Sequence, residues 1–196
     1  MSGAGGAEFA VRLAAPGDAP LVAALGARLF AQAYGATHPE PELTPYLERT
    51  HAPAVYRAAL ADPAQAVLVA EDAAGDAVGY AHVRPTAEPR PAGVPGARPY
   101  ELLRFYVDEA WQGRGVAAAL LAAADRAAAE RGADALWLDV WSEATRAVRF
   151  YERAGFRVVG ATTFAWGARR DADHVMARPV PAPAPPAPPA PPALPA

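Results

Sequence analysis

The sequence predicts one α/β domain with a mixed, twisted central sheet of six or seven strands flanked by helices. Short runs rich in valine, leucine and aromatic residues, typical of strands, alternate with longer segments in which apolar residues recur at helical spacing. The strand-like runs at 66–71 and 77–83 are separated only by a turn-forming segment and are predicted to pair as an antiparallel hairpin. The runs at 102–107 and 135–141 are separated by a long helix-like segment, which predicts a parallel pair.

The first half of this domain is predicted to begin with a strand, a helix and a further helical segment, at 9–13, 19–34 and 44–61. Asp18 stands directly before the first helix, where an aspartate is a preferred N-cap residue. Pro53 is expected to divide the third segment into two short helices, because proline inside a helix removes a backbone hydrogen bond.

The second half contains the clearest helical pattern, at 116–131, and Gly132 is placed to end that helix. Ser142 is expected to cap a further helix. Two more strands are predicted at 156–161 and 174–178, which completes the sheet.

The domain is expected to span residues 9–180, between two segments of different composition. Residues 1–8 are rich in glycine and alanine and are predicted to form a flexible N-terminus. Residues 181–196 are almost entirely proline and alanine, which favours a disordered tail of polyproline-II character. The tail contains P-x-x-P spacings, so a role in binding a partner stays open as an alternative to a plain spacer.

A glycine turn, residues 112–118, joins the strand at 102–107 to the long helix. The first turn of a helix leaves backbone N–H groups without intrahelical partners, and the helix dipole adds partial positive charge there. Gly113 and Gly115 would let the backbone approach a phosphate closely, and Arg114 could add a charge-assisted hydrogen bond. We therefore interpret this turn as a binding site for a pyrophosphate.

Three phosphate-binding motifs compete for the glycine turn. The P-loop motif requires a lysine, and the chain contains none. The dinucleotide motif G-x-G-x-x-[GA] is matched by Gly113, Gly115 and Ala118, but a hairpin upstream does not suit the βαβ unit that this motif opens. The third motif, Q-x-x-G-x-[GA], is matched by Gln112, Gly115 and Ala117. This segment resembles the coenzyme-A pyrophosphate motif of the GNAT superfamily of N-acetyltransferases.

A second segment carries the same resemblance, through the pattern A-[IV]-x-F-Y-x-x-x-G-F. The matching residues are Ala147, Val148, Phe150, Tyr151, Gly155 and Phe156. The resemblance covers residues 9–180 and implies that the two parallel central strands splay around the cofactor. It also implies direct transfer of an acetyl group from acetyl-CoA to a primary amine of a small molecule or peptide, without a covalent enzyme intermediate.

The resemblance further implies roles for individual residues. Tyr151 would be the general acid that protonates the departing thiolate, which suits a phenol with an ordinary pKa of about 10, and the alternative is an aromatic used only for packing. Glu101 or Asp139 would be the general base that takes the proton of the amine, and the choice between them stays open. The implied cofactor-binding residues are Phe105, Tyr106, Val107, Gln112, Gly113, Arg114, Gly115, Val116, Ala117 and Ala118.

One position departs from the superfamily pattern. Relatives often have an asparagine seven residues before the tyrosine, whereas this chain has Ala144. The expected loss is a hydrogen bond to the cofactor chain or to the helix end, which Ser142 or Glu143 could replace. A rival interpretation is therefore a catalytically silent coenzyme-A-binding sensor or adaptor that uses the proline-rich tail.

The acceptor pocket is expected to be built from residues 34–56, 86–99 and 163–173, whose sequences do not identify the amine. Asp171 and Asp173, in the last of these segments, are interpreted as ordinary loop charges. The resemblance is also compatible with a homodimer.

Composition and charge argue against several other classes of protein. A net charge of −3 without a basic stripe argues against nucleic-acid binding. The longest apolar run, at 116–124, is far shorter than the roughly 20 residues that span a bilayer, so no membrane association is expected. No metal site is expected, since the chain has no cysteine and its four histidines lack metal-ligand spacing. The N-terminus lacks the pattern of a signal peptide, which favours a cytoplasmic protein.

Overall fold

The structure is a computed structural model that describes residues 8–37, 43–166 and 169–180. Its strands are β1 (Phe9–Leu13), β2 (Ala66–Asp72), β3 (Ala77–Pro85), β4 (Pro99–Val107), β5 (Ala135–Trp141), β6 (Arg157–Trp166) and β7 (Arg169–Pro179). Its helices are α1 (Ala19–Tyr34), α2 (Leu43–Thr50), α3 (Pro53–Ala61), α4 (Val116–Glu130) and α5 (Thr145–Arg153), with short 3₁₀ helices η1 (Pro16–Asp18) and η2 (Glu109–Trp111). The predictions of a flexible start and a disordered proline-rich tail fall on residues 1–7 and 181–196, which lie outside the described residues.

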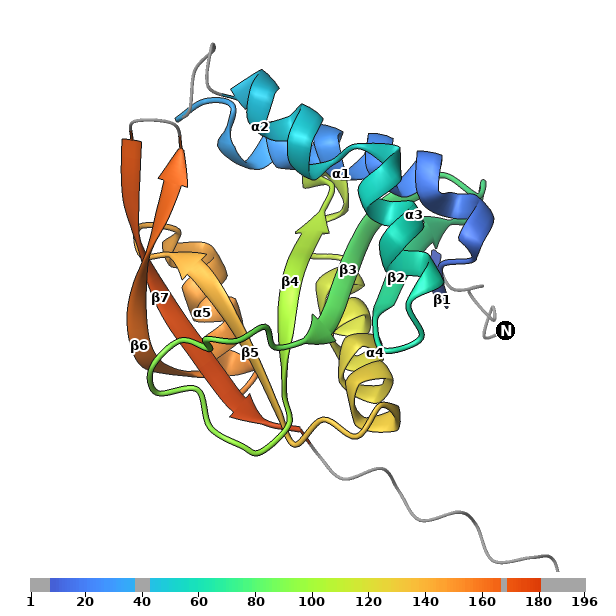
Figure 1. The fold of residues 1–196 in the computed structure, drawn as a ribbon. Coiled ribbons are helices and arrows are strands. Elements are labelled where there is room, and N and C mark those ends of the chain that lie inside the picture. Colours follow the sequence, from blue (N-terminus) through green and yellow to red (C-terminus); the bar gives the residue numbers. More distant parts are fainter. Residues whose placement is uncertain (1–7, 38–42, 167–168, 181–196) are drawn as a thin grey trace, which may run out of the picture.

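The seven strands form one mixed sheet in the order β1-β2-β3-β4-β5-β7-β6 (Figure 1). β4 and β5 are parallel and are connected through α4, and the other neighbouring pairs are antiparallel. The predicted α/β fold, the β2–β3 hairpin and the parallel pair are therefore confirmed.

The last two strands extend beyond their predicted limits of 156–161 and 174–178. The added residues of β7 include Asp171 and Asp173, which lie within the ladder that β7 forms with β6. Carboxylates inside a strand explain the short prediction, because strands are recognised from their β-branched and aromatic residues.

Helices cover both faces of the sheet (Figure 1). On one face, Val22 and Leu25 of α1 and Tyr56 of α3 are buried against β2 and β3. On the other face, α4 buries the apolar side that the sequence predicts, with Val116, Leu120, Leu121 and Ala124 in the core. Each large apolar side chain buried in this way contributes about 1.5–3 kcal/mol relative to an exposed one, so the two core layers fix the sheet between them.

The parallel strands β4 and β5 separate along their length. They pair only where Pro99–Glu101 lies beside Ala135–Trp137. Beyond that point β4 stays paired with β3 as far as Val107, and β5 stays paired with β7 as far as Trp141. The carboxyl ends of the two strands therefore splay apart, as predicted, and open the sheet near its middle.

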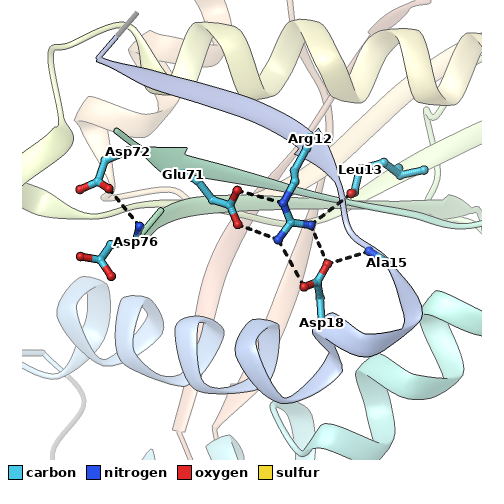
Figure 2. Close-up of polar contacts among 7 residues, drawn as sticks. All are labelled: Arg12, Leu13, Ala15, Asp18, Glu71, Asp72 and Asp76. Carbon is cyan, nitrogen blue, oxygen red and sulfur yellow. Dashed lines mark hydrogen bonds and ion pairs between the residues drawn. The ribbon is translucent and has the colours of Figure 1, made fainter. Parts of the chain in front are cut away.

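A cluster around Arg12 ties the first strand to its surroundings (Figure 2). The Arg12 guanidinium donates to Asp18 at 2.6 Å and to Glu71 of β2 at 2.6 Å. Asp18 directly precedes α1, but its carboxylate makes no cap bond to that helix and instead accepts the Ala15 N–H at 2.7 Å. Asp18 therefore stands at the predicted N-cap position of α1, but its carboxylate binds Arg12 and the Ala15 N–H and makes no cap bond to the helix.

Two other predictions about helix ends have different outcomes. α2 ends at Thr50 and α3 begins at Pro53, which confirms the division by that proline. α5 begins at Thr145 with Ala144 as its N-cap, so the prediction that Ser142 caps this helix is wrong. Ser142 instead belongs to the turn after β5, where its N–H donates to the backbone oxygen of Ala172 at 3.0 Å.

Candidate active site

A central cleft of about 490 Å³ lies where β4 and β5 separate. Its walls come from α1, α2, β4, β5, α5 and the β6–β7 hairpin, so residues from both halves of the sheet meet there. Among the residues predicted for the site, those that line the cleft are Glu101, Phe105, Tyr106, Val107, Gln112, Asp139 and Tyr151. The fold thus brings the predicted catalytic residues together with part of the predicted cofactor-binding strand.

The other predicted cofactor-binding residues belong to the glycine turn and the start of α4, next to Gln112. Gly113 and Gly115 have φ angles of +81° and +88°, in the left-handed region that side chains disfavour. A Cβ added at either glycine would meet nothing within 4 Å, so backbone conformation, and not lack of space, explains the glycines. Because Gly115 is the N-cap of α4, no cap side chain competes for the first N–H groups of that helix.

The polar side chains of the turn are arranged around this helix end. The Gln112 side chain donates to the backbone oxygen of Val107 at 3.4 Å and accepts from Arg146 of α5. Arg114 is about half exposed and lies over the ring of Trp111, 5.0 Å from its centroid. Free N–H groups, a helix dipole and an exposed guanidinium together suit a pyrophosphate, so the turn fits the group that its motif implies.

Tyr151 lies on α5 at the other side of the cleft from α1. Its side chain is buried among aromatic rings, with centroids at 5.3 Å for Phe150, 5.6 Å for Phe156 and 6.0 Å for Phe105. This burial, together with Tyr34 and Asp139 nearby, raises the pKa of Tyr151 well above the ordinary value for a phenol. The hydroxyl therefore stays protonated at neutral pH and is able to donate its proton.

The two candidate bases lie in different surroundings. Glu101 is buried, and its carboxylate accepts a hydrogen bond from Arg84 Nε at 2.7 Å. Asp139 is open to solvent in the cleft and forms no ion pair with any residue in the described ranges. Desolvation raises the pKa of both carboxyl groups, because Asp139, although exposed, lies inside the cleft, where neighbouring residues displace part of its water. Glu101 thus has a built-in cationic partner, whereas Asp139 is accessible and has none.

Two further acids belong to this cleft. Asp171 and Asp173 are not loop charges, as interpreted from the sequence, but strand residues of β7 that are 8% and 7% exposed and line the cleft. Burial, followed by the charges of Asp139 and Asp171, raises the pKa of Asp173 to about 7. The spacing of the two acids is a signal for this arrangement, because residues two apart in a strand lie on one face of the sheet.

The expected acceptor-side segments are only partly found at the cleft. Tyr34, Tyr46 and Phe164 line it, as two of the three segments predict. No residue of the 86–99 segment lines it, because that loop covers the neighbouring part of the sheet, where Val94 packs against Trp137. His51 and His82 have structural roles away from the chemistry. His51 Nδ1 hydrogen-bonds the Tyr56 hydroxyl, and His82 Nε2 hydrogen-bonds the Gln65 side chain.

In the part of the chain that the structure describes, no three histidine or acidic side chains are grouped so as to hold a metal ion. None of the helices described is long and apolar enough to cross a lipid bilayer.

Comparison with known proteins agrees with the architecture of the cleft. The model of the acetyltransferase (GNAT) family matches residues 28–156. An uncharacterised N-acetyltransferase of Mycobacterium tuberculosis is 33% identical over 161 residues, which cover 82% of this chain and 97% of that protein. The PaiA N-acetyltransferase from Thermoplasma acidophilum, solved in complex with coenzyme A, has a TM-score of 0.68 at 16% identity and covers 87% of this chain and 98% of its own. A GCN5-related N-acetyltransferase from Rhodopseudomonas palustris has a TM-score of 0.64 at 22% identity over 87% and 94% of the two chains.

Proposed function

Because the chain belongs to the acetyltransferase (GNAT) family and is an acyltransferase, we propose that its cleft transfers the acetyl group of acetyl-CoA to a primary amine. The observation that carries the proposal is the meeting of both sequence motifs at one opening in the sheet. Gln112, from the first motif, and Tyr151, from the second, line the same cleft between the splayed strands.

The glycine turn and β4 would hold acetyl-CoA, which supplies an activated thioester when bound. The first N–H groups of α4 and the Arg114 guanidinium would bind its pyrophosphate. The unpaired edge of β4 from Phe105 to Val107 faces the opening and offers backbone groups to the pantetheine arm. A backbone N–H on this edge would stabilise negative charge on the acetyl oxygen during transfer.

Asp139 and Tyr151 would move the two protons of the reaction. Asp139, directly or through a water, would take the proton of the attacking amine, since its carboxylate is accessible and has no cationic partner in the described part of the chain. The amine nitrogen bonds to the acetyl carbon as the carbon–sulfur bond breaks. The Tyr151 hydroxyl would then donate its proton to the departing sulfur. Glu101, held by Arg84, is the alternative base.

Isothermal titration with acetyl-CoA, and separately with NADH, tests the cofactor site. We expect micromolar binding of acetyl-CoA by the wild type, its loss in Gly115→Glu, and no binding of NADH. Gly75→Glu is the matched control, because Gly75 in the β2–β3 turn has the same left-handed φ of +89° and equally open space. Failure of the wild type to bind acetyl-CoA would refute the proposal.

Steady-state kinetics on a panel of amines test the roles of Tyr151 and the acids. Tyr151→Phe should lower kcat about 10²- to 10⁴-fold while acetyl-CoA affinity is retained, as expected for the loss of a general acid. Asp139→Asn should lower kcat more than Glu101→Gln does if Asp139 is the base. The buried Tyr100, outside the cleft lining, provides the control Tyr100→Phe. Acetyl-CoA binding without acetylation of any amine would favour the coenzyme-A-binding adaptor instead.

A further inference from the structure

The acids of the cleft lie together on one face of the sheet. Asp139 and Trp141 occupy alternate positions of β5, and Trp141 is directly opposite Asp173 in the β5–β7 ladder. Residues opposite one another, and residues two apart in a strand, point to the same face. Asp139, Asp171 and Asp173 therefore share one face, and all three line the cleft.

The two positive charges near Asp139 have other partners. Arg84 binds Glu101, as described above. Arg104 is the one basic residue among the described residues that line the cleft, and its guanidinium donates to the Thr50 backbone oxygen at 3.2 Å and lies 3.4 Å from His51 Nε2. Neither Asp139 nor Asp173 forms an ion pair within residues 8–37, 43–166 and 169–180.

Asp173 is a buried acid whose hydrogen bonding is incomplete. It is only 7% exposed, and its Oδ1 atom has no hydrogen-bond partner in the described structure. A buried carboxylate without a cation or a full set of donors is costly, and such groups in native proteins call for an explanation. A positively charged ligand would supply both the charge and the donors.

Aromatic rings that line the cleft with these acids suit the same kind of ligand. Phe30 and Tyr34 of α1, Tyr46 of α2 and Phe164 of β6 line the cleft, and the Phe30 and Tyr46 rings stack at 4.9 Å while Tyr46 meets Phe164 edge-on at 5.7 Å. The face of an aromatic ring attracts ammonium groups, most strongly where water is excluded. The acids and the aromatic rings of this cleft together therefore favour an ammonium ion over an anion.

We propose that the acceptor is a small molecule with two amino groups, of which one is acetylated while the other, as an ammonium ion, is bound by Asp173 with Asp171 beside it. The proposal rests on the proposed function and specifies its substrate class. The volume of about 490 Å³ must hold both the end of the cofactor and the acceptor, which favours a small molecule over a peptide. Asp173 is then a specificity-determining residue, distinct from the groups that move protons.

Matched amines test this selectivity in the full chain at saturating acetyl-CoA. The set compares α,ω-diamines of three to six methylene groups with the alkylamines and amino alcohols of equal length, plus a short peptide with a free N-terminus and a lysine. We expect the best diamine to exceed its monoamine in kcat/KM by at least about tenfold, and Asp173→Asn to lower this ratio about 10- to 100-fold, as for a charge-assisted hydrogen bond. Asp76→Asn, on the exposed β2–β3 turn, should leave the ratio unchanged.

A binding measurement separates this proposal from the proposed function. Titration of diaminobutane into the protein should show binding that Asp173→Asn weakens and Asp76→Asn does not, whether or not acetyl transfer occurs. If acetyl-CoA fails to bind but diaminobutane binds through Asp173, the proposed function fails and the cation site stands. Equal use of monoamines and diamines, a ratio that Asp173→Asn does not change, or acetylation of the peptide alone would overturn the diamine proposal.

Discussion

Two groups of acids lie in opposite halves of the sheet, and only one of them contains its own cation. At the β1 edge, Arg12 stands between Asp18 and Glu71 and donates to both carboxylates (Figure 2). In the cleft beside β7, Asp139 and Asp173 have no cationic partner in the described ranges. The charges of the first group are neutralised by Arg12 and stabilise the fold. The second group lacks such a cation and suits a ligand that carries positive charge.

The pKa shifts of the two groups run in opposite directions. Hydrogen bonds from Arg12 lower the pKa of Asp18 below its ordinary value of 3.8. Burial raises the pKa of Asp173 to about 7. Asp18 therefore stabilises the fold when it is ionised, and Asp173 destabilises the fold when it is ionised. Variants at the two sites should change stability with opposite signs.

The largest effect on stability is expected from Arg12→Met. The substitution removes the cation and leaves two carboxylates near each other, which should lower the free energy of unfolding by about 1–2 kcal/mol once solvent screening of this partly exposed side chain is allowed for. Because the pKa of Asp18 is lowered in the fold, the loss should be complete above about pH 4 and should disappear as the pH falls through the lowered pKa. Urea unfolding of the wild type and the variant at pH 7 and at pH 3 measures the loss of unfolding free energy at each pH. An equal loss at the two pH values would contradict the electrostatic explanation.

The features that the sequence predicts well depend on local patterns of residues. Gly113, Gly115 and Tyr151 belong to local motifs whose spacing is set by a single turn or helix, so each motif can be recognised from the sequence alone. Gln112 of the first motif and Tyr151 of the second both line the cleft. The parallel pair follows from a strand–helix–strand order, which is equally local.

The surroundings of Asp18 and Asp173 depend on residues that are distant in the sequence. Asp18 stands at the N-cap position of α1 that the sequence predicts, but its carboxylate binds Arg12, whose other partner, Glu71, is 59 residues further along the chain. The sequence does not show that Asp173 is a buried strand residue, because its burial follows from the pairing of β7 with β5 and β6. No local pattern determines whether an acid will meet a cation across a sheet, so the roles of these two residues required the structure.

A smaller effect, of opposite sign, is expected for Asp173→Asn. With a pKa raised to about 7 in the fold, Asp173 keeps its proton between about pH 4 and 7 while the unfolded chain loses it, so stability falls as the pH rises through this window. Asparagine has the same shape without the charge and should relieve part of this penalty, because its buried amide group also needs hydrogen-bond partners. We expect the Tm of the variant to exceed that of the wild type by about 2–4 °C at pH 8, and by much less at pH 4.5, in thermal unfolding followed by circular dichroism.

The wild-type Tm should also respond to the ligand at this site. Diaminobutane at pH 8 should raise the Tm of the wild type more than that of Asp173→Asn, because a ligand that binds only the folded state stabilises it. If Asp173→Asn shows no increase in Tm at either pH, Asp173 is already compensated in solution, and the distinction between the two groups of acids fails.

The smallest effect is expected from Arg12→Lys, which keeps the charge of the first group but changes its geometry. The Arg12 guanidinium places Nε and Nη2 on Glu71 and both Nη atoms on Asp18, an arrangement that a single ammonium group cannot reproduce. We expect a loss of about 0.5–1 kcal/mol, less than for Arg12→Met, because the Coulomb attraction is retained. Raising the salt concentration to about 1 M should reduce the difference in unfolding free energy between Arg12→Lys and Arg12→Met, since salt screens the positive charge that only the lysine variant has. If the lysine variant is as unstable as the methionine variant at low salt, the fork geometry of Arg12, and not its charge, holds the β1 edge together.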